Sequence, residues 1–322
     1  MRVGVDIRSL LDRHLTGVGE YTQQLLEALL FDGHDDTYVL FSNTFRGSPS
    51  VPSHWLTGRA ELRTFPFPNK LFNLSLLALH WPKLDRLCGQ IDCFFAPNLQ
   101  FCPLTDDMPF VLTVHDLSFV HYRELLSLHR RFWHTLVRPR ELCARADAIC
   151  AVSNATAVDC ARTFSLPQEK IHPIHSGCTT LLVSDELRAR VRSAWRLPAH
   201  FLLLLSTIEP RKNLLAALDA FTLLRQRSDY DGGLVIAGAP GWSRGALKTA
   251  LERHPYRDAI QVLPYVTTEE KHALFSLADV FLYLSVYEGF GFPPLEAAAQ
   301  GTPVVAGHHS SLTELLDGSA LL

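Results

Sequence analysis

Two glutamates, Glu288 and Glu296, lie on either side of a turn rich in glycine and proline. The turn follows an apolar stretch, 280–286, that predicts a buried strand, and it precedes an alanine run that favours a helix. Glycines expose backbone N–H groups to a ligand, and the amino end of a helix attracts phosphate. Carboxylates beside such a turn can accept hydrogen bonds from sugar hydroxyls. The run predicts a nucleotide-sugar site; taken singly, Glu296 could instead complement the helix dipole and Glu288 could be a solvated turn residue.

A basic pair, Arg211 and Lys212, follows another apolar run, 201–206, just before a predicted helix. Arginine offers a planar fork to phosphate oxygens, and lysine offers a mobile point charge. Ligands of open α/β sheets bind at the carboxyl ends of strands, so a diphosphate is the natural partner of this pair. The pair alone is a weak signal, because basic residues also occur by chance at helix starts.

Two segments in the first half of the chain also follow predicted strands. Gly17 and Gly19 come after the apolar run 2–6 and open a predicted helix, where they either admit a phosphate or sugar or form only a tight turn. They make an incomplete dinucleotide fingerprint, because position 22 is not glycine and no acidic residue stands out after the next strand. We therefore do not expect a hydride-transfer cofactor. His115 ends the apolar run 110–114 and is either a ligand contact or a satisfied core histidine.

Strand-sized apolar runs alternate with helical stretches along the chain, which predicts parallel α/β layers. The predicted strands are 2–6, 38–41, 93–95, 110–114, 148–152 and 170–174 in the first half, and 201–206, 232–237, 260–263, 280–284 and 303–306 in the second. The predicted helices of the second half are 214–227, 246–253, 269–276 and 294–300. A charged stretch without a strand signal separates the halves, so we predict domains at 1–178 and 198–322 joined by a linker at 179–197.

Composition excludes several classes of protein. The 322 residues are 47% hydrophobic and 20% charged, which is typical of a globular chain of about two domains. A net charge of −3 gives no sign of a nucleic-acid partner, and no apolar run is long enough to cross a bilayer. The seven cysteines form no C-x-x-C pair and no zinc pattern, so we expect reduced thiols and no bound metal.

Taken together, these motifs resemble those of the retaining glycosyltransferases of family 4, and the resemblance covers nearly the whole chain. It rests on the run from Glu288 to Glu296 with Gly301-Thr302-Pro303-Val304-Val305 after it, on Glu209-Pro210-Arg211-Lys212-Asn213, on His115-Asp116-Leu117 and on Thr16-Gly17-Val18-Gly19-Glu20-Tyr21. The resemblance implies the GT-B fold, in which two doubly wound Rossmann-like domains face a central cleft. Gly238-Ala239-Pro240-Gly241-Trp242 is similar to a run of the mannosyltransferase-like members.

The resemblance also implies a role for each candidate residue. Arg211 and Lys212 would hold the donor diphosphate, and His115 would orient the donor sugar without acting as a general base. Glu288 would grip the transferred sugar and Glu296 the ribose. The remaining donor contacts would come from Gly17 and Gly19 near the diphosphate, from Val266 and Lys271 near the base, and from the backbone of Phe290, Gly291 and Phe292. For Lys271, an ordinary surface lysine is an equal alternative.

Two departures from the family pattern stand out. Ser176-Gly177-Cys178-Thr179 replaces the usual N-G-V-D, and the sequence stops at Leu322 where relatives continue with further helices. We therefore expect a C-terminal truncation that leaves an uncovered strand at 320–322.

The function implied is a metal-independent, retaining hexosyltransferase without a cofactor. We expect GDP-mannose as donor, with UDP-sugars next, and a glycan or lipid-linked glycan as acceptor. The expected location is cytoplasmic. Peripheral contact with the inner membrane face through Arg130, His134 and Arg138, or through 71–81, is an alternative to a solvated basic face and a core helix. The rival functions are a non-catalytic nucleotide-sugar binder, inactivated by the truncation, and a dinucleotide-dependent oxidoreductase.

Overall fold

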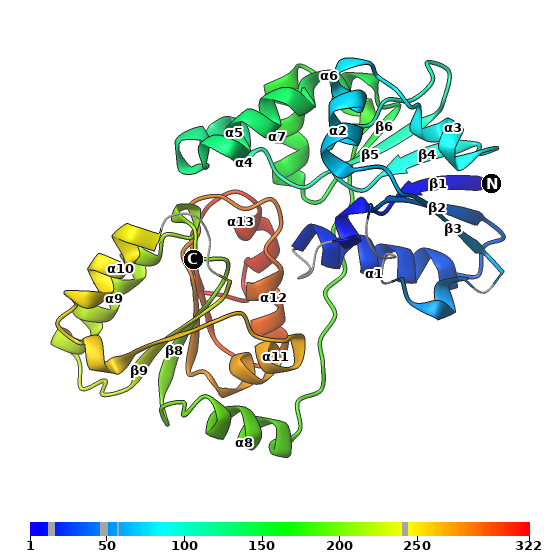
Figure 1. Cartoon of the computed structure of the whole chain (residues 1–322). Coiled ribbons are helices and arrows are strands. Elements are labelled where there is room, and N and C mark those ends of the chain that lie inside the picture. Colours follow the sequence, from blue (N-terminus) through cyan, green and yellow to red (C-terminus); the bar gives the residue numbers. More distant parts are fainter. Residues whose placement is uncertain (12–16, 46–50, 57, 240–243) are drawn as a thin grey trace. The chain divides into compact units, whose positions relative to one another are not determined.

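The computed structural model describes residues 1–11, 17–45, 51–56, 58–239 and 244–322, and it divides into two compact units, Met1–Gly177 and Cys178–Leu322. Each unit is built on its own parallel sheet with helices on both faces (Figure 1). The prediction of parallel α/β layers is confirmed for both halves of the chain.

The first unit holds a seven-stranded sheet in the order β3-β2-β1-β4-β5-β6-β7. Its strands are β1 (Arg2–Asp6), β2 (Thr37–Asn43), β3 (Ala60–Phe65), β4 (Cys93–Ala96), β5 (Phe110–Val114), β6 (Ala148–Ala151) and β7 (Ile171–Pro173). Its helices are α1 (Gly17–Phe31), α2 (Asn69–Ala78), α3 (Leu84–Cys88), α4 (Ser118–His121), α5 (Leu128–Val137), α6 (Pro139–Arg145) and α7 (Asn154–Phe164), with short 3-10 turns η1 (Arg8–Leu11), η2 (Ser53–Leu56), η3 (Arg123–Leu125) and η4 (Gln168–Lys170).

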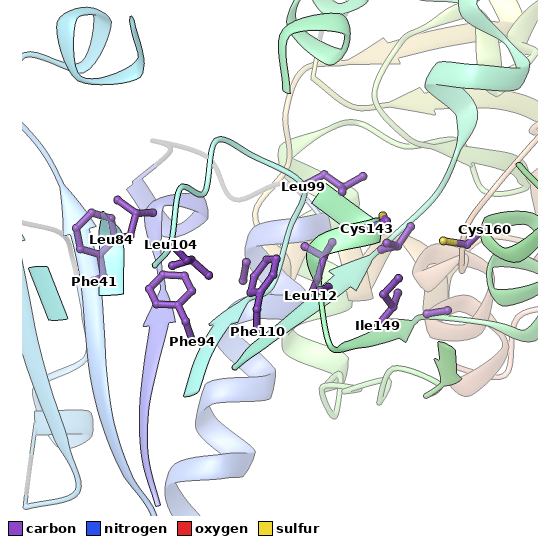
Figure 2. Close-up of a cluster of buried hydrophobic side chains, with 14 of the residues drawn as sticks. Phe41, Leu84, Phe94, Leu99, Leu104, Phe110, Leu112, Cys143, Ile149 and Cys160 are labelled. Carbon is purple, nitrogen blue, oxygen red and sulfur yellow. The ribbon is translucent and has the colours of Figure 1, made fainter. Parts of the chain in front are cut away.

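Alternate side chains of these strands pack into two separate hydrophobic cores, one on each face of the sheet. Val5 and Leu40 pack with Leu26 of α1 on one face of the sheet. The opposite face carries a larger cluster, in which Phe41, Phe94 and Phe110 pack under α2, α3, α6 and α7 (Figure 2). The alternation follows from the two-residue period of a strand, and it explains why α1 lies across the sheet from α2 and α6 (Figure 1).

The second unit holds a five-stranded sheet in the order β10-β9-β8-β11-β12. Its strands are β8 (Phe201–Leu205), β9 (Gly233–Ala237), β10 (Ile260–Leu263), β11 (Val280–Tyr283) and β12 (Val304–Ala306). Its helices are α8 (Asp185–Ala194), α9 (Leu214–Arg227), α10 (Arg244–Glu252), α11 (Thr268–Leu277), α12 (Phe292–Ala299) and α13 (Ser311–Leu316), with 3-10 turns η5 (Pro210–Lys212) and η6 (Arg257–Ala259). Leu202 and Leu204 face α9 and α10, whereas Leu203 faces α11 and α12.

Every predicted strand is present, with small differences at the ends, and one strand was missed. Strand β3 pairs with β2 at the edge of the first sheet, and its side chains are mostly half-buried or exposed. An edge strand of this kind has no continuous apolar run, which is the signal that marks buried parallel strands.

The predicted linker and the C-terminal segment both take part in the second unit. Within 179–197, the predicted linker, α8 buries Val191 in the core of the second unit, and the Trp195 indole donates to Glu270 at 3.0 Å. Within 320–322, Leu321 forms a parallel bridge with Val305 at the edge of the second sheet.

Over the described ranges, none of the helices combines the length and the apolar character that crossing a bilayer requires.

Candidate functional site

The best candidate site lies where the second sheet reverses its strand order. β8 is the first strand of this unit, β9 and β10 extend the sheet on one side of it, and β11 and β12 extend it on the other. The segments that leave β8 and β11 are therefore neighbours at the switch point, where open α/β sheets bind ligands. A backbone hydrogen bond joins them, because the Val286 N–H donates to the Arg211 carbonyl at 3.0 Å.

Four charged side chains meet at this point, and we call Glu209, Arg211, Lys212 and Glu288 the charge cluster. Lys212 Nζ donates to Glu288 Oε1 at 2.5 Å, and Arg211 Nη1 lies 2.9 Å from Glu288 Oε2. Arg211 Nη2 also contacts Glu209 Oε1 at 2.9 Å. Two carboxylates thus balance two cations. The arrangement brings together three of the residues predicted to bind the donor.

The charge cluster is buried, and the pKa values of its members depend on both burial and the neighbouring charges. Burial alone would raise the pKa of Glu288, but attraction to Lys212 and Arg211 outweighs it and lowers the pKa to about 2. Burial lowers the pKa of Lys212, and the Glu288 carboxylate opposes that effect. At neutral pH Glu288 is an anion, so it can accept hydrogen bonds from hydroxyls and cannot act as a general acid. A solvated Glu288, the alternative for this residue, is wrong.

The backbone around Glu288 is held partly by residues that no sequence motif singled out. The Glu288 N–H donates to Ser310 Oγ at 3.0 Å, and the Ser311 hydroxyl donates to the Glu288 carbonyl at 3.0 Å. Ser310 has a φ of 46° and a ψ of −130°, a conformation that favours glycine. Arg211 also donates to the Tyr287 carbonyl at 2.7 Å. These contacts come from segments distant in sequence, so no local pattern could have revealed them.

The turn after Glu288 ends as predicted, at the start of a helix. Gly291 caps α12 with a φ of 121°, a backbone conformation that requires glycine, and a Cβ there would meet Leu312 Cδ2 at 2.7 Å and displace that side chain. The Phe290 side chain is buried, and its ring lies 5.0 Å from that of Phe292. The predicted contact of Phe290, Gly291 and Phe292 with a ligand can therefore involve mainly backbone groups.

A second buried ion pair lies at the side of α12. Lys271 Nζ on α11 donates to Glu296 Oε1 at 2.7 Å, and their side chains are only 13% and 6% exposed. The alternative that Lys271 is a surface lysine is therefore wrong. Val266 precedes α11 and buries its side chain in the core, so only its backbone remains for the predicted contact with a base. The structure thus places Val266, Lys271 and Glu296 around the start of α11 and the first turns of α12.

In the first unit, His115 lies at the carboxyl end of β5 beside the first turns of α1. His115 Nε2 lies 2.8 Å from the Pro97 carbonyl, and the Tyr21 ring meets the imidazole edge-on at 4.8 Å. Gly17 and Gly19 lie one turn earlier on α1, at its amino end. Because a carbonyl only accepts hydrogen bonds, Nε2 carries the proton and Nδ1 is the acceptor. Burial lowers the pKa of His115, which keeps the ring neutral near pH 7.

A buried ion pair at the end of β1 was not anticipated. The Arg8 guanidinium contacts Asp6 at 2.6 Å and donates to the Phe101 carbonyl at 2.8 Å. Asp6 is fully buried, so this arginine is committed to the protein itself. Its only signal in the sequence was an acidic residue at the end of the first strand.

The predicted basic face of 130–138 is wrong. Helix α5 ends at Val137, and Arg138 follows in a left-handed conformation, so it does not continue the helical face. The His134 ring stacks on Phe119 at 4.3 Å, and burial lowers its pKa to about 4. His134 is therefore an uncharged packing residue at neutral pH.

A metal site was not expected from the sequence. Among residues 1–11, 17–45, 51–56, 58–239 and 244–322, no group of three or more His, Cys, Asp or Glu side chains is placed to hold a metal ion. Thr16 and the segment 240–243 of the predicted mannosyltransferase-like run lie outside the described residues.

Comparisons with known proteins agree with this architecture. Residues 15–180 match the family model for Glycosyltransferase Family 4, and residues 185–318 match that for Glycosyl transferases group 1. The fold is similar to that of HepE of Anabaena, solved with UDP and glucose (TM-score 0.71, 18% identity, 98% of this chain and 83% of that one). Sucrose-phosphate synthase of Thermosynechococcus elongatus is also similar (TM-score 0.75, 20% identity, 100% and 85%).

Sequence relatives include several mannosyltransferases. The chain is 29% identical to O-antigen chain mannosyltransferase B of Escherichia coli over 223 residues, which cover 66% of this chain and only 56% of that protein. It is 28% identical to the MMP alpha-(1->4)-mannosyltransferase of Mycolicibacterium hassiacum, over 94% of this chain and 80% of the relative. Both halves of the sequence match their family models, and both halves have the expected sheet. The chain therefore belongs to glycosyltransferase family 4, among the group 1 glycosyl transferases.

Proposed function

We propose that the protein is a retaining hexosyltransferase that moves a sugar from a nucleoside diphosphate donor to a hydroxyl of a glycan or lipid-linked glycan. The observation that carries this proposal is the buried charge cluster at the switch point of the second sheet. A diphosphate can bond to Arg211 and Lys212 there, while Glu288 accepts hydrogen bonds from sugar hydroxyls.

The roles follow from the charges. The departing diphosphate gains negative charge during transfer, and Arg211 and Lys212 are held in place to stabilise it. Glu296 lies on the helix that follows the turn, and we assign it to the ribose hydroxyls with Lys271 beside it. In the first unit, the Nδ1 atom of neutral His115 can accept a hydrogen bond from a sugar hydroxyl.

The contacts of the carboxylates fit a retaining transfer that has no covalent intermediate. Glu288 and Glu209 are both bonded to cations, so we assign them to binding and orientation and not to covalent attack on the sugar. The departing diphosphate would then take the acceptor proton on the same face. Because two protein cations can bond to the diphosphate, we expect transfer to continue after divalent metals are removed.

Mannose is the sugar proposed first, with GDP-mannose as donor, because the sequence relatives named above are mannosyltransferases. UDP-sugars are the next candidates, since HepE was solved with UDP and glucose.

The experiment is a transfer assay with GDP-mannose and UDP-glucose, with and without EDTA, in which NMR of the product gives the anomeric configuration. We expect an α-linked product from an α-linked donor, formed at the same rate in EDTA. An inverted product would contradict the retaining mechanism. Donor binding without turnover, with every acceptor offered, would instead indicate a nucleotide-sugar binder.

A further inference from the structure

Tyr283 lies directly against the lysine of the charge cluster. It is the last residue of β11 and is 3% exposed. Lys212 Nζ donates to the Tyr283 hydroxyl at 3.0 Å, and the same nitrogen lies 5.0 Å from the centre of the tyrosine ring. The ring itself packs at 5.9 Å from Phe281 within the core, so its position is fixed. Tyr283 therefore offers Lys212 a rigid partner made of a hydroxyl and an aromatic face.

The two partners of Lys212 restrict how its ammonium group can point. A lysine ammonium has three N–H donors. One donates to Glu288 Oε1 at 2.5 Å and another to the Tyr283 hydroxyl at 3.0 Å. Fixing two donors sets the direction of the third. Lysine normally loses considerable rotamer freedom when it binds a ligand, and a preset ammonium avoids much of that loss.

We propose that Tyr283 is a positioning residue that fixes the Lys212 ammonium for the diphosphate of the donor. The proposal rests on the function proposed above, in which Lys212 binds the diphosphate. Tyr283 acts through the charge cluster, because its hydroxyl accepts from Lys212 and also interacts with the Glu288 carboxylate.

The charge of the Lys212 ammonium also depends on the Tyr283 hydroxyl. Burial lowers the pKa of Lys212, and the ammonium faces Glu288, Glu209 and the like-charged Arg211. Burial raises the pKa of Tyr283 well above its ordinary value, so the phenol stays neutral and keeps accepting the ammonium hydrogen bond. Removal of the hydroxyl takes away a partner of the charged form, which lowers the pKa of Lys212 further.

The test compares Tyr283→Phe with wild type by calorimetric titration of GDP and of guanosine between pH 6 and 10. The Phe variant keeps the ring and the core packing. We expect GDP affinity to fall about tenfold, the equivalent of one lost hydrogen bond to a charged group. Guanosine affinity should stay unchanged, and the loss of GDP affinity at high pH should begin at a lower pH. If wild type prefers UDP, UDP and uridine replace this pair.

Tyr230→Phe is the matched control, because the Tyr230 hydroxyl lies in the same unit and donates to the Gly233 carbonyl at 3.4 Å. It should change neither affinity. The role of Tyr283 would be overturned if GDP and guanosine lost affinity equally. It would also be overturned if neither the GDP affinity nor the pH at which that affinity begins to fall changed. If wild type binds no nucleoside diphosphate at all, the proposed function fails and takes this inference with it.

Discussion

The two sheets reverse their strand order in the same way, but the two reversal points differ in how many charged side chains they gather. In the second unit the point between β8 and β11 gathers two cations and two carboxylates that bond to one another. In the first unit the corresponding end of β1 holds Arg8 in a bond with buried Asp6, and the nearby His115 is neutral. The same topology therefore gathers two cations and two carboxylates in one unit, and a single ion pair in the other.

The shared topology provides the location, and we expect the side chains placed there to decide the ligand. Arg8 cannot serve a phosphate without losing Asp6 and the Phe101 carbonyl. Arg211 and Lys212 share their carboxylates in a balanced group, so an incoming diphosphate can take part in the same network. We therefore expect loss of the two cations of the second unit to weaken nucleotide binding, and loss of His115 in the first unit to affect transfer alone.

The largest effect should come from Glu288→Gln. The amide keeps the size of the side chain but loses the charge that accepts sugar hydroxyls and holds Lys212. We expect kcat to fall by about a thousandfold, the size of effect seen when a strong transition-state interaction is removed. GDP affinity by calorimetry should remain within about threefold, because the amide oxygen can still accept from Lys212 and both cations keep their charge. Transfer at the wild-type rate would remove Glu288 from the donor site.

The next largest effect should come from changing both Arg211 and Lys212 to Gln. Loss of the charge-assisted hydrogen bonds should weaken GDP binding roughly a hundredfold or more. Removal of the cations also leaves Glu209 and Glu288 buried without partners, which can destabilise the fold. A variant that also changes these two glutamates to Gln leaves no unpaired charge, so it should fold and still fail to bind GDP.

Lys248→Ala provides the control for this pair. Lys248 is 75% exposed and lies 3.7 Å from Glu252 on the surface of α10. Its loss should leave GDP affinity unchanged. Normal GDP binding by the folded variant with all four Gln substitutions would mean that the diphosphate binds elsewhere.

In the first unit, His115→Ala should lower kcat by about tenfold through loss of one hydrogen bond to a sugar hydroxyl, with GDP affinity unchanged. Steady-state kinetics and calorimetry on the same variant separate these effects. A fall in GDP affinity equal to the fall in kcat would contradict the assignment of neutral contacts to this unit.

The pH dependence gives an independent check on His115. Because burial lowers its pKa below the ordinary 6.5, the folded protein binds this proton less readily than the unfolded chain. The stability that this neutral histidine contributes is fully present above pH 6.5 and is lost as the pH falls through the pKa of His115 in the folded protein. Denaturant titrations from pH 8 to 5 should therefore show wild type losing more stability than His115→Gln. An equal loss of unfolding free energy between pH 8 and 5 in both proteins would contradict a buried, neutral His115.

The smallest effect should come from Ser310, whose strained backbone supports Glu288. Ser310→Gly relieves a φ of 46° and loses the bond to the Glu288 N–H, whereas Ser310→Ala loses the bond and keeps the strain. We expect both to lower kcat by about threefold, and Gly to be more stable than Ala by about 1 kcal/mol. Unfolding curves and kcat measure the two effects separately. Equal stability of the two variants would show that the backbone of Ser310 carries no strain.

The sequence predicted much of this fold and part of the site, for physical reasons that can be traced to particular residues. Buried parallel strands such as β8 and β9 are continuous apolar runs, so they stand out, whereas the half-exposed edge strand β3 does not. Arg211, Lys212 and Glu288 were found because each lies in a local motif at a strand end. Their bonds to one another could not be read, since they join segments far apart in the chain.

Residues without a local signal were missed or misjudged. Tyr283 lies within the predicted strand 280–284, and Ser310 lies in none of the motifs; only the tertiary contacts reveal that they touch Lys212 and Glu288. His134 was misjudged because its helical spacing suggested charge, whereas packing on Phe119 makes it neutral. Periodicity reports which residues share a face, but ionisation depends on burial that the sequence does not contain.

The most direct test of the central claim is a thermal-shift panel of the wild-type protein with GDP, UDP, ADP and NAD. A ligand that binds only the folded state adds about 2.7 kcal/mol of stability at a hundredfold excess over its Kd. We predict a selective rise in Tm with one nucleoside diphosphate, GDP first, that disappears in the variant with the charge cluster replaced by Gln. No shift with any diphosphate, or a shift with NAD alone, would contradict a nucleotide-sugar site at the charge cluster.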